Sequence, residues 1–146
     1  MRRLALLLVS VFALAACGGS SHTPTAMTND TAGALAQIKG AYQKFFSGRT
    51  SVSDRVALLQ NGPQFKSVIQ VFASNPLAKN VNVAVSSVRL EGANEAKVVY
   101  TVKLGSAGLP KQTGTAVREN GTWKVGYASL CRLVALQGST PPACKP

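Results

Sequence analysis

The chain has 146 residues, with 16 basic and five acidic side chains, so its formal net charge is +11. This length accommodates one domain with a hydrophobic core, and the ordinary aliphatic content argues against wholesale disorder. The positive charge favours contact with anionic lipid headgroups or acidic envelope polymers. It does not indicate a nucleic-acid partner, because phosphate affinity without a localised basic patch is weak and salt-sensitive.

The first 16 residues are typical of a bacterial secretory signal. Arg2 and Arg3 precede an apolar run over 4–13, and Leu14-Ala15-Ala16-Cys17 resembles the lipobox of bacterial lipoproteins. As a helix the apolar segment spans about 20 Å, against about 30 Å for the hydrocarbon core, so we expect no stable membrane span. The resemblance implies cleavage before Cys17, a diacylglycerol thioether on its sulfur and usually acylation of the new amino terminus, for example by palmitate. The alternative is an ordinary secretory signal followed by an unrelated cysteine.

Residues 17–30 are predicted to form a lipidated, flexible tether that holds the domain clear of the bilayer. After Cys17 the stretch continues with glycine and serine, is polar, and has no apolar periodicity. The one histidine of the chain, His22, lies here and is expected to be solvated. The remaining residues, 31–146, are predicted to form a single domain. After removal of residues 1–16 the chain keeps 14 basic and five acidic residues, a net charge of +9.

Three helices are predicted in the first half of this domain. The first covers about 31–46, the second about 53–60 with Ser53 as its N-cap, and the third begins near Gly62 and stops at Asn75-Pro76. Apolar residues at helical spacing give the first and third helices one buried stripe each, namely Leu35, Ile38, Tyr42 and Phe45, and then Phe65, Val68, Ile69 and Phe72.

Beyond Asn80 the apolar period changes to two, which predicts four antiparallel strands. The first strand runs from Val81 to Leu90 and needs a bulge at Ser86-Ser87 to keep one apolar face. The second ends at Leu104, the third covers about 111–118, and Asn120-Gly121 is a strong hairpin signal. Alternating apolar residues place Trp123, Val125 and Tyr127 on a fourth strand, and a short helix follows with Ser129 as cap and Leu130, Leu133 and Val134 inward.

This order of elements defines an α+β domain of two layers. Three N-terminal helices pack on a curved four-stranded antiparallel meander, and a short C-terminal helix closes the chain. Three cysteines are an odd number for an exported protein, and if Cys17 carries lipid, Cys131 and Cys144 can pair. Such a disulfide stabilises by about 3 kcal/mol in the chain-entropy estimate. The alternatives are two free thiols or a metal site, but a metal site needs histidine or more cysteine nearby, so we expect no metal and no cofactor.

Several stretches resemble the low-molecular-weight antigen family of mycobacterial exported proteins. They are Thr50-Ser51-Val52-Ser53, Leu58-Leu59-Gln60-Asn61-Gly62, and Glu119-Asn120-Gly121-Thr122-Trp123-Lys124-Val125 leading into Ala128-Ser129. The likeness covers most of residues 31–138. It implies a cone-shaped domain of the cystatin-like or nuclear-transport-factor-like type, in which helices close over the sheet, and an envelope or secreted location. It implies no known activity, since members are known chiefly as exported antigens.

The sequence argues against catalysis. Some domains of this cone type are isomerases or dehydratases that use a buried carboxylate or histidine as a general base. The predicted domain contains no histidine. Its acidic residues are predicted to lie in helix caps, in first turns or at hairpin ends, and none is mid-strand on an apolar face. The acidic residues of the chain, with the one in the tether included, are Asp30, Asp54, Glu91, Glu95 and Glu119. An isomerase- or dehydratase-like enzyme is therefore the disfavoured hypothesis.

Two binding hypotheses remain for a protein lipid-anchored on the extracytoplasmic face of the cell membrane, and shed or secreted in part. The first is an interaction module for an anionic envelope component, with a basic sheet surface made of Lys97, Lys103 and Lys124; the alternative is a solvated face whose lysines deter edge pairing. The second is a carrier of a small apolar ligand in a pocket lined by four aromatic side chains, Tyr42, Phe46, Tyr100 and Trp123. The alternative is that these four side chains simply form the core. The sequence does not predict the partner or the oligomeric state.

Overall fold

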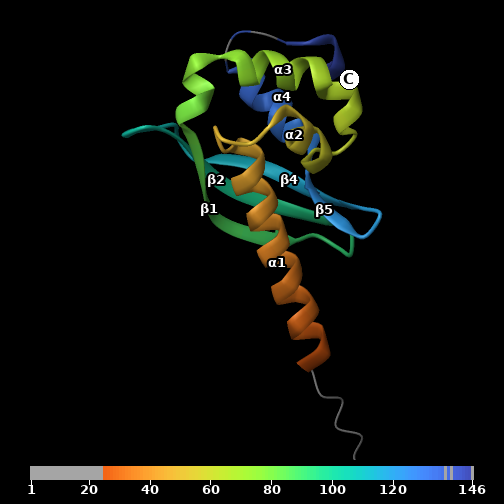
Figure 1. Ribbon diagram of the computed structural model, residues 1–146. Coiled ribbons are helices and arrows are strands. Elements are labelled where there is room, and N and C mark those ends of the chain that lie inside the picture. Colours follow the sequence, from red (N-terminus) through yellow and green to blue (C-terminus); the bar gives the residue numbers. More distant parts are fainter. Residues whose placement is uncertain (1–24, 137, 139, 146) are drawn as a thin grey trace, which may run out of the picture.

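The computed structural model describes residues 25–136, 138 and 140–145. The predicted signal peptide, Cys17 and the first part of the predicted tether lie outside the described residues. Figure 1 shows helices on one side of a curled antiparallel sheet, which confirms the predicted α+β architecture. In the described part of the chain, none of the helices combines the length and the apolar content that crossing a bilayer would need.

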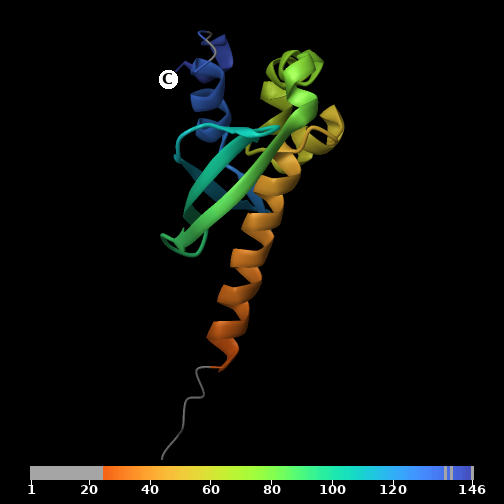
Figure 2. The same ribbon diagram turned by 90° about the vertical axis from the view of Figure 1, so that its left-hand side faces the viewer.

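Helix α1 is the long helix that lies against the sheet. It spans Thr25–Phe46, 22 residues, and so begins six residues before the predicted start, inside the predicted tether. Figures 1 and 2 show its first turns projecting beyond the sheet, and this explains the difference: apolar spacing marks only the part of a helix that packs. The packed part buries the predicted Ile38, Tyr42 and Phe45.

Two short helices and two 3-10 turns connect α1 to the sheet. Ser51, and not the predicted Ser53, caps α2, because the Ser51 Oγ accepts a hydrogen bond from the backbone N–H of Asp54 at 3.1 Å. The predicted inward residues of α3 are buried, and Asn75 ends that helix as expected. The elements are α2 (Val52–Leu58), η1 (Gly62–Phe65), α3 (Lys66–Ser74) and η2 (Pro76–Asn80).

The sheet has the strand order β1-β2-β4-β5, with all neighbours antiparallel. The predicted bulge is confirmed, since the pairing of β1 with β2 shifts register between Val85 and Ser87. The predicted hairpin is also confirmed, because Asn120 and Gly121 have φ values of 50° and 79°, as a type I′ turn requires. The strands are β1 (Val81–Leu90), β2 (Glu95–Leu104), the two-residue β3 (Ala107–Gly108) beside β2, β4 (Gln112–Glu119) and β5 (Thr122–Val125).

The fourth predicted strand is too long, and the cap of the last helix is wrong. Strand β5 ends at Val125, and Gly126 is the N-cap of α4 (Tyr127–Ala135), which is followed by η3 (Pro142–Cys144). The N–H of Gly126 donates to the Thr115 carbonyl at 2.7 Å as the chain leaves the sheet. Tyr127 therefore begins the helix instead of continuing the alternation, and its ring stacks on Phe65 with centroids 5.5 Å apart.

Candidate functional site

The four aromatic residues predicted to line a pocket lie in the packed core. Tyr42, Phe46, Tyr100 and Trp123 are each at most 4% exposed. The rings of Tyr42 and Tyr100 have centroids 5.1 Å apart, and the rings of Phe46 and Tyr100 stack at 5.6 Å. Since all four side chains are buried, and the rings of Tyr42, Phe46 and Tyr100 pack on one another, these residues form part of the core, as the alternative interpretation predicts.

A buried cluster of hydroxyl groups joins α1, β4 and α4. Tyr42 Oη donates to the Thr115 carbonyl at 2.6 Å and lies 2.9 Å from Ser129 Oγ, which accepts the Thr115 N–H at 3.1 Å. Burial raises the pKa of Tyr42, and it raises the pKa of Tyr100 to about 12, so both phenols stay neutral. Strand β5 does not reach Thr115, so these hydroxyls supply hydrogen-bond partners for the backbone N–H and carbonyl of that residue. The role of the cluster is therefore structural.

Arg55 is a buried charged residue that the sequence did not single out. It is 2% exposed and lies beneath the end of α1. Its Nε donates to the Phe45 carbonyl at 3.0 Å, and its Nη2 donates to the Ser47 carbonyl at 2.7 Å. The guanidinium also lies 5.3 Å from the ring centroid of Phe72. Burial lowers the pKa of Arg55, and its contacts identify it as the C-terminal cap of α1.

An apolar groove of about 450 Å³ opens at the wide end of the domain. Figure 2 shows α3 and α4 on opposite sides of the wide end of the domain, with strand ends of the sheet between them. One wall comes from α3 and η2, the floor from the start of β1 and the end of β2, and the other wall from α4. We call this the mouth groove; its lining is Phe72, Asn75, Leu77, Ala78, Val81, Leu104, Leu109, Pro110, Gln112, Leu133 and Leu136.

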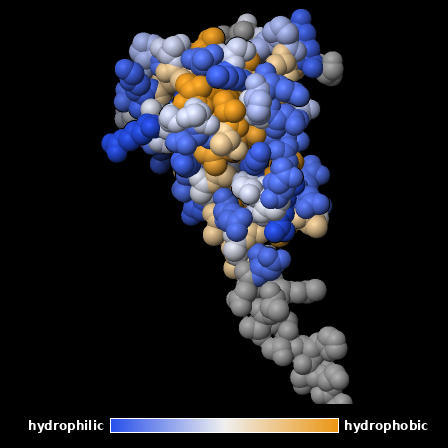
Figure 3. Space-filling view, turned by 45° about the vertical axis from the view of Figure 1, so that its right-hand side comes forward, coloured by the Kyte–Doolittle hydropathy of each residue, from blue (hydrophilic) through white to orange (hydrophobic). Residues whose placement is uncertain are grey.

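Two leucines on opposite walls of the mouth groove lie largely in solvent. Leu77 is 68% exposed and Leu136 is 60% exposed. Figure 3 shows a different face of the molecule, on which apolar side chains gather in the upper half and hydrophilic ones cover most of the rest. Sequence reasoning missed the groove because its lining comes from three stretches far apart in the chain, 72–81, 104–112 and 133–136. Leu77 in particular follows Pro76 outside any periodic stripe.

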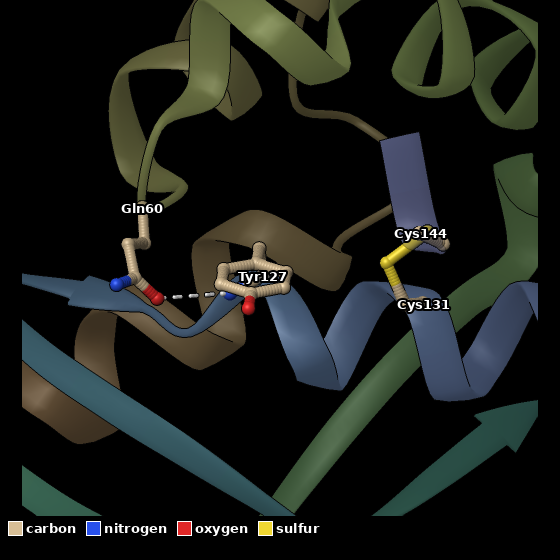
Figure 4. Close-up of a disulfide and its surroundings, with 4 residues drawn as sticks. All are labelled: Gln60, Tyr127, Cys131 and Cys144. Atoms are coloured by element: carbon tan, nitrogen blue, oxygen red, sulfur yellow. Dashed lines mark hydrogen bonds between the residues drawn. A yellow bond between two sulfur atoms is a disulfide. The ribbon is translucent and has the colours of Figure 1, made fainter. Parts of the chain in front are cut away.

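The disulfide fixes the helix that forms one wall of the groove. Cys131 on α4 is bonded to Cys144 on η3, with Cα atoms 5.4 Å apart, so the predicted pairing is confirmed (Figure 4). The start of the same helix is held by Gln60, whose side-chain oxygen accepts the Tyr127 N–H at 3.4 Å. A disulfide of this kind is typical of proteins that fold outside the cytoplasm.

The three lysines of the predicted basic surface do not form one patch. They share the outer face of the sheet, but Lys124 is half-buried and paired with Glu119, at an N–O distance of 3.0 Å. Lys97 lines a small polar cleft that also contains Glu91. Lys103 lies six residues further along β2, about 20 Å away, near the mouth groove.

The carboxylates of the domain are dispersed over its surface. Besides the Lys124 pair, Asp54 lies 3.9 Å from Lys44, and Glu91 lies 2.6 Å from Arg89. Over the described ranges, histidine, cysteine, aspartate and glutamate form no group of three or more that could hold a metal ion.

Comparison with known proteins connects the chain to one family and to several solved structures. Two of these structures have TM-scores of 0.42 and 0.41 and low sequence identity. The first, from Campylobacter jejuni and provisionally described as an NTF2-like transpeptidase, is 10% identical and matches over 68% of this chain and 96% of its own. The second, from Shewanella oneidensis, is an NTF2-like protein of unknown function, 12% identical over 68% of this chain and 93% of its own. No curated protein sequence matches the chain.

The sequence resemblance stated at the outset is confirmed by a family model. The model describes the C-terminal domain of the low molecular weight antigen MTB12, and it matches residues 30–141. This range contains all four α-helices of the described residues, apart from the first turns of α1, and the whole sheet. The chain therefore belongs to the MTB12 low molecular weight antigen family.

Proposed function

We propose that this protein is an exported, lipid-anchored binding protein that holds a small apolar molecule in the mouth groove. The observation that carries the proposal is the groove itself, with its apolar lining and its two exposed leucines. Its volume of about 450 Å³ falls within the usual range for small-molecule sites. This is the carrier hypothesis with a different pocket from the one that the sequence predicts.

The chemistry of the lining favours binding over catalysis. Its two polar members are the side-chain amides of Asn75 and Gln112, and neither is a general base. The remaining lining residues are aliphatic, apart from Phe72 and Pro110. An aliphatic chain of the ligand would gain about 0.8 kcal/mol for each methylene that it buries here.

Three observations support the proposed location. The lipobox-like stretch ends at Cys17, the chain belongs to an antigen family, and α4 carries a disulfide. Two or three acyl chains at Cys17 would give stable membrane attachment, whereas a single chain would be marginal. We expect Cys17→Ala to release the exported protein from the membrane fraction into the soluble fraction. A variant that stays membrane-bound after a high-salt wash would rule out the lipid anchor.

The groove can be tested with 1-monododecanoylglycerol, a neutral single-chain lipid, and the soluble Cys17→Ala form of the full chain. We expect saturable binding in titration calorimetry below the critical micelle concentration. Leu77→Asp together with Leu136→Asp should weaken binding at least tenfold, because a charge then faces the alkyl chain from each wall. Both positions are exposed, so the variant should keep its fold.

The matched control is Val71→Asp. Val71 lies on α3, is 72% exposed and is absent from the groove lining, so its replacement should leave the affinity unchanged. The proposal fails if the unmodified groove does not bind the lipid, or if the two leucine replacements leave the affinity as it was.

A further inference from the structure

The mouth groove meets a second hollow that is polar and basic. This basic cleft, of about 480 Å³, is formed by residues 47–49, residues 79–82 and Gly105. Val81 lines both hollows, and in two further places one residue lines the groove while the next residue in the sequence lines the cleft. Ala78 and Leu104 face the groove, whereas Lys79 and Gly105 face the cleft. The two hollows are therefore adjoining parts of one surface.

Close backbone packing brings the two cations of the cleft together. The N–H of Gly48 donates to the Val81 carbonyl at 3.0 Å, and a side chain at Gly48 would overlap the backbone of Lys79. No residue other than glycine fits this approach, which brings the segment that carries Arg49 against the segment that carries Lys79, and both residues line the cleft. The opposite side is closed by the N–H of Gly105, which donates to the Asn80 carbonyl at 3.3 Å.

The three glutamates of the sheet lie at the end away from the mouth, where Glu91 and Glu119 pair with Arg89 and Lys124. The antiparallel order places the starts of β1 and β4 and the end of β2 at the mouth, and this end carries the exposed Arg49, Lys79, Lys103 and Lys111. The other end carries Glu91, Glu95 and Glu119. A ten-residue strand separates the two ends by about 33 Å, more than three Debye lengths at 0.1 M salt.

The remaining two carboxylates do not neutralise the cleft either. Asp54 is paired with Lys44, and Asp30 precedes the end of α1 by 16 residues, about 24 Å along the helix. Among the described residues, neither Arg49 nor Lys79 lies within ion-pair distance of a carboxylate. The cleft thus presents two cations to solvent, next to an apolar groove.

We propose that the basic cleft binds the anionic headgroup of the same ligand whose alkyl chain occupies the mouth groove. The ligand is then a single-chain amphiphile with an oxyanion headgroup. The guanidinium of Arg49 and the ammonium of Lys79 are donors suited to oxyanions, and the amides of Asn80 and Asn82 add neutral donors. This inference rests on the proposed function, because the groove must hold the chain for the cleft to hold the headgroup.

The experiment compares three probes on the soluble Cys17→Ala full chain by titration calorimetry. They are dodecyl phosphate, 1-monododecanoylglycerol and inorganic phosphate. We expect dodecyl phosphate to bind at least tenfold more tightly than the neutral lipid at 20 mM salt, and the preference to shrink at 300 mM salt. Arg49→Gln with Lys79→Gln should abolish the preference while leaving the affinity for the neutral lipid unchanged, which also shows that the fold is intact.

The matched control removes the same charge elsewhere. Lys39 on α1 and Lys97 near the start of β2 lie outside the cleft lining, so Lys39→Gln combined with Lys97→Gln should keep the tenfold preference. Equal binding of the two lipids overturns the headgroup site but leaves the proposed function standing. A preference that survives in the Arg49 and Lys79 variant overturns it as well. Inorganic phosphate binding as tightly as dodecyl phosphate would show a free-phosphate site instead, and failure of both lipids would overturn the proposed function itself.

Discussion

Replacing Gly114 by alanine should lower the free energy of unfolding by about 3 kcal/mol. Gly114 lies on β4, buried at the centre of the hydroxyl cluster. A Cβ at this position would stand inside van der Waals distance of both Ser129 Oγ and Tyr42 Oη, and 3.0 Å from Tyr100 Cε1. The methyl group would force these side chains apart and leave buried hydroxyls without partners. Urea unfolding, followed by the fluorescence of the single tryptophan, measures the loss.

Gly40→Ala is the matched control for this prediction. A Cβ at Gly40, on the exposed side of α1, would have no atom within 4 Å. Alanine has a higher helix propensity, so this variant should be more stable by up to about 1 kcal/mol. If Gly114→Ala unfolds at the same urea concentration as the unaltered chain, the cluster does not constrain the core.

Arg55→Met should also cost about 3 kcal/mol of unfolding free energy, because the carbonyls of Phe45 and Ser47 lose their donors in a buried place. Methionine keeps much of the side-chain volume, so the loss reports the hydrogen bonds more than a cavity. Arg55→Lys should recover only part of the stability, since a single ammonium does not reproduce the two-pronged geometry of the guanidinium. Thermal unfolding measured by circular dichroism separates the two variants.

The control for Arg55 is an exposed arginine with a similar local bond. Arg118 is exposed, and its Nε donates to the Gly121 carbonyl at a distance of 3.4 Å. Arg118→Met should change the free energy of unfolding by less than about 0.5 kcal/mol. Equal effects of the Arg55 and Arg118 replacements would contradict the capping role.

The sheet was the most predictable part of the fold, because local signals determine it. Alternating valines mark β1, the break in their phase at Ser86-Ser87 requires the bulge, and Asn120-Gly121 defines the hairpin. Tyr127 shows where such signals fail: it continues the alternation of β5, yet Gly126 bonds to the Thr115 carbonyl and turns the chain into a helix. A contact between distant residues overrides the local pattern there.

The candidate site was less predictable than the fold. The aromatic residues looked suited to a pocket by type, but whether such rings line a space or fill it depends on how closely α1 packs on β2. Arg55 gave no signal, since a charged residue on a short helix is expected in solvent. Its burial follows from the two carbonyls at the end of α1, which no local pattern reveals.

The projecting part of α1 has a consequence for how a cargo is exchanged. Its first turns lie at the opposite end of the molecule from α3 and α4, which line the mouth groove (Figure 1), and a 22-residue helix is about 33 Å long. If the protein is attached at Cys17, the length of this helix separates the groove from the end of the domain that is nearest the attachment point in the sequence. An apolar cargo would then have to cross water between the membrane that holds the anchor and the groove.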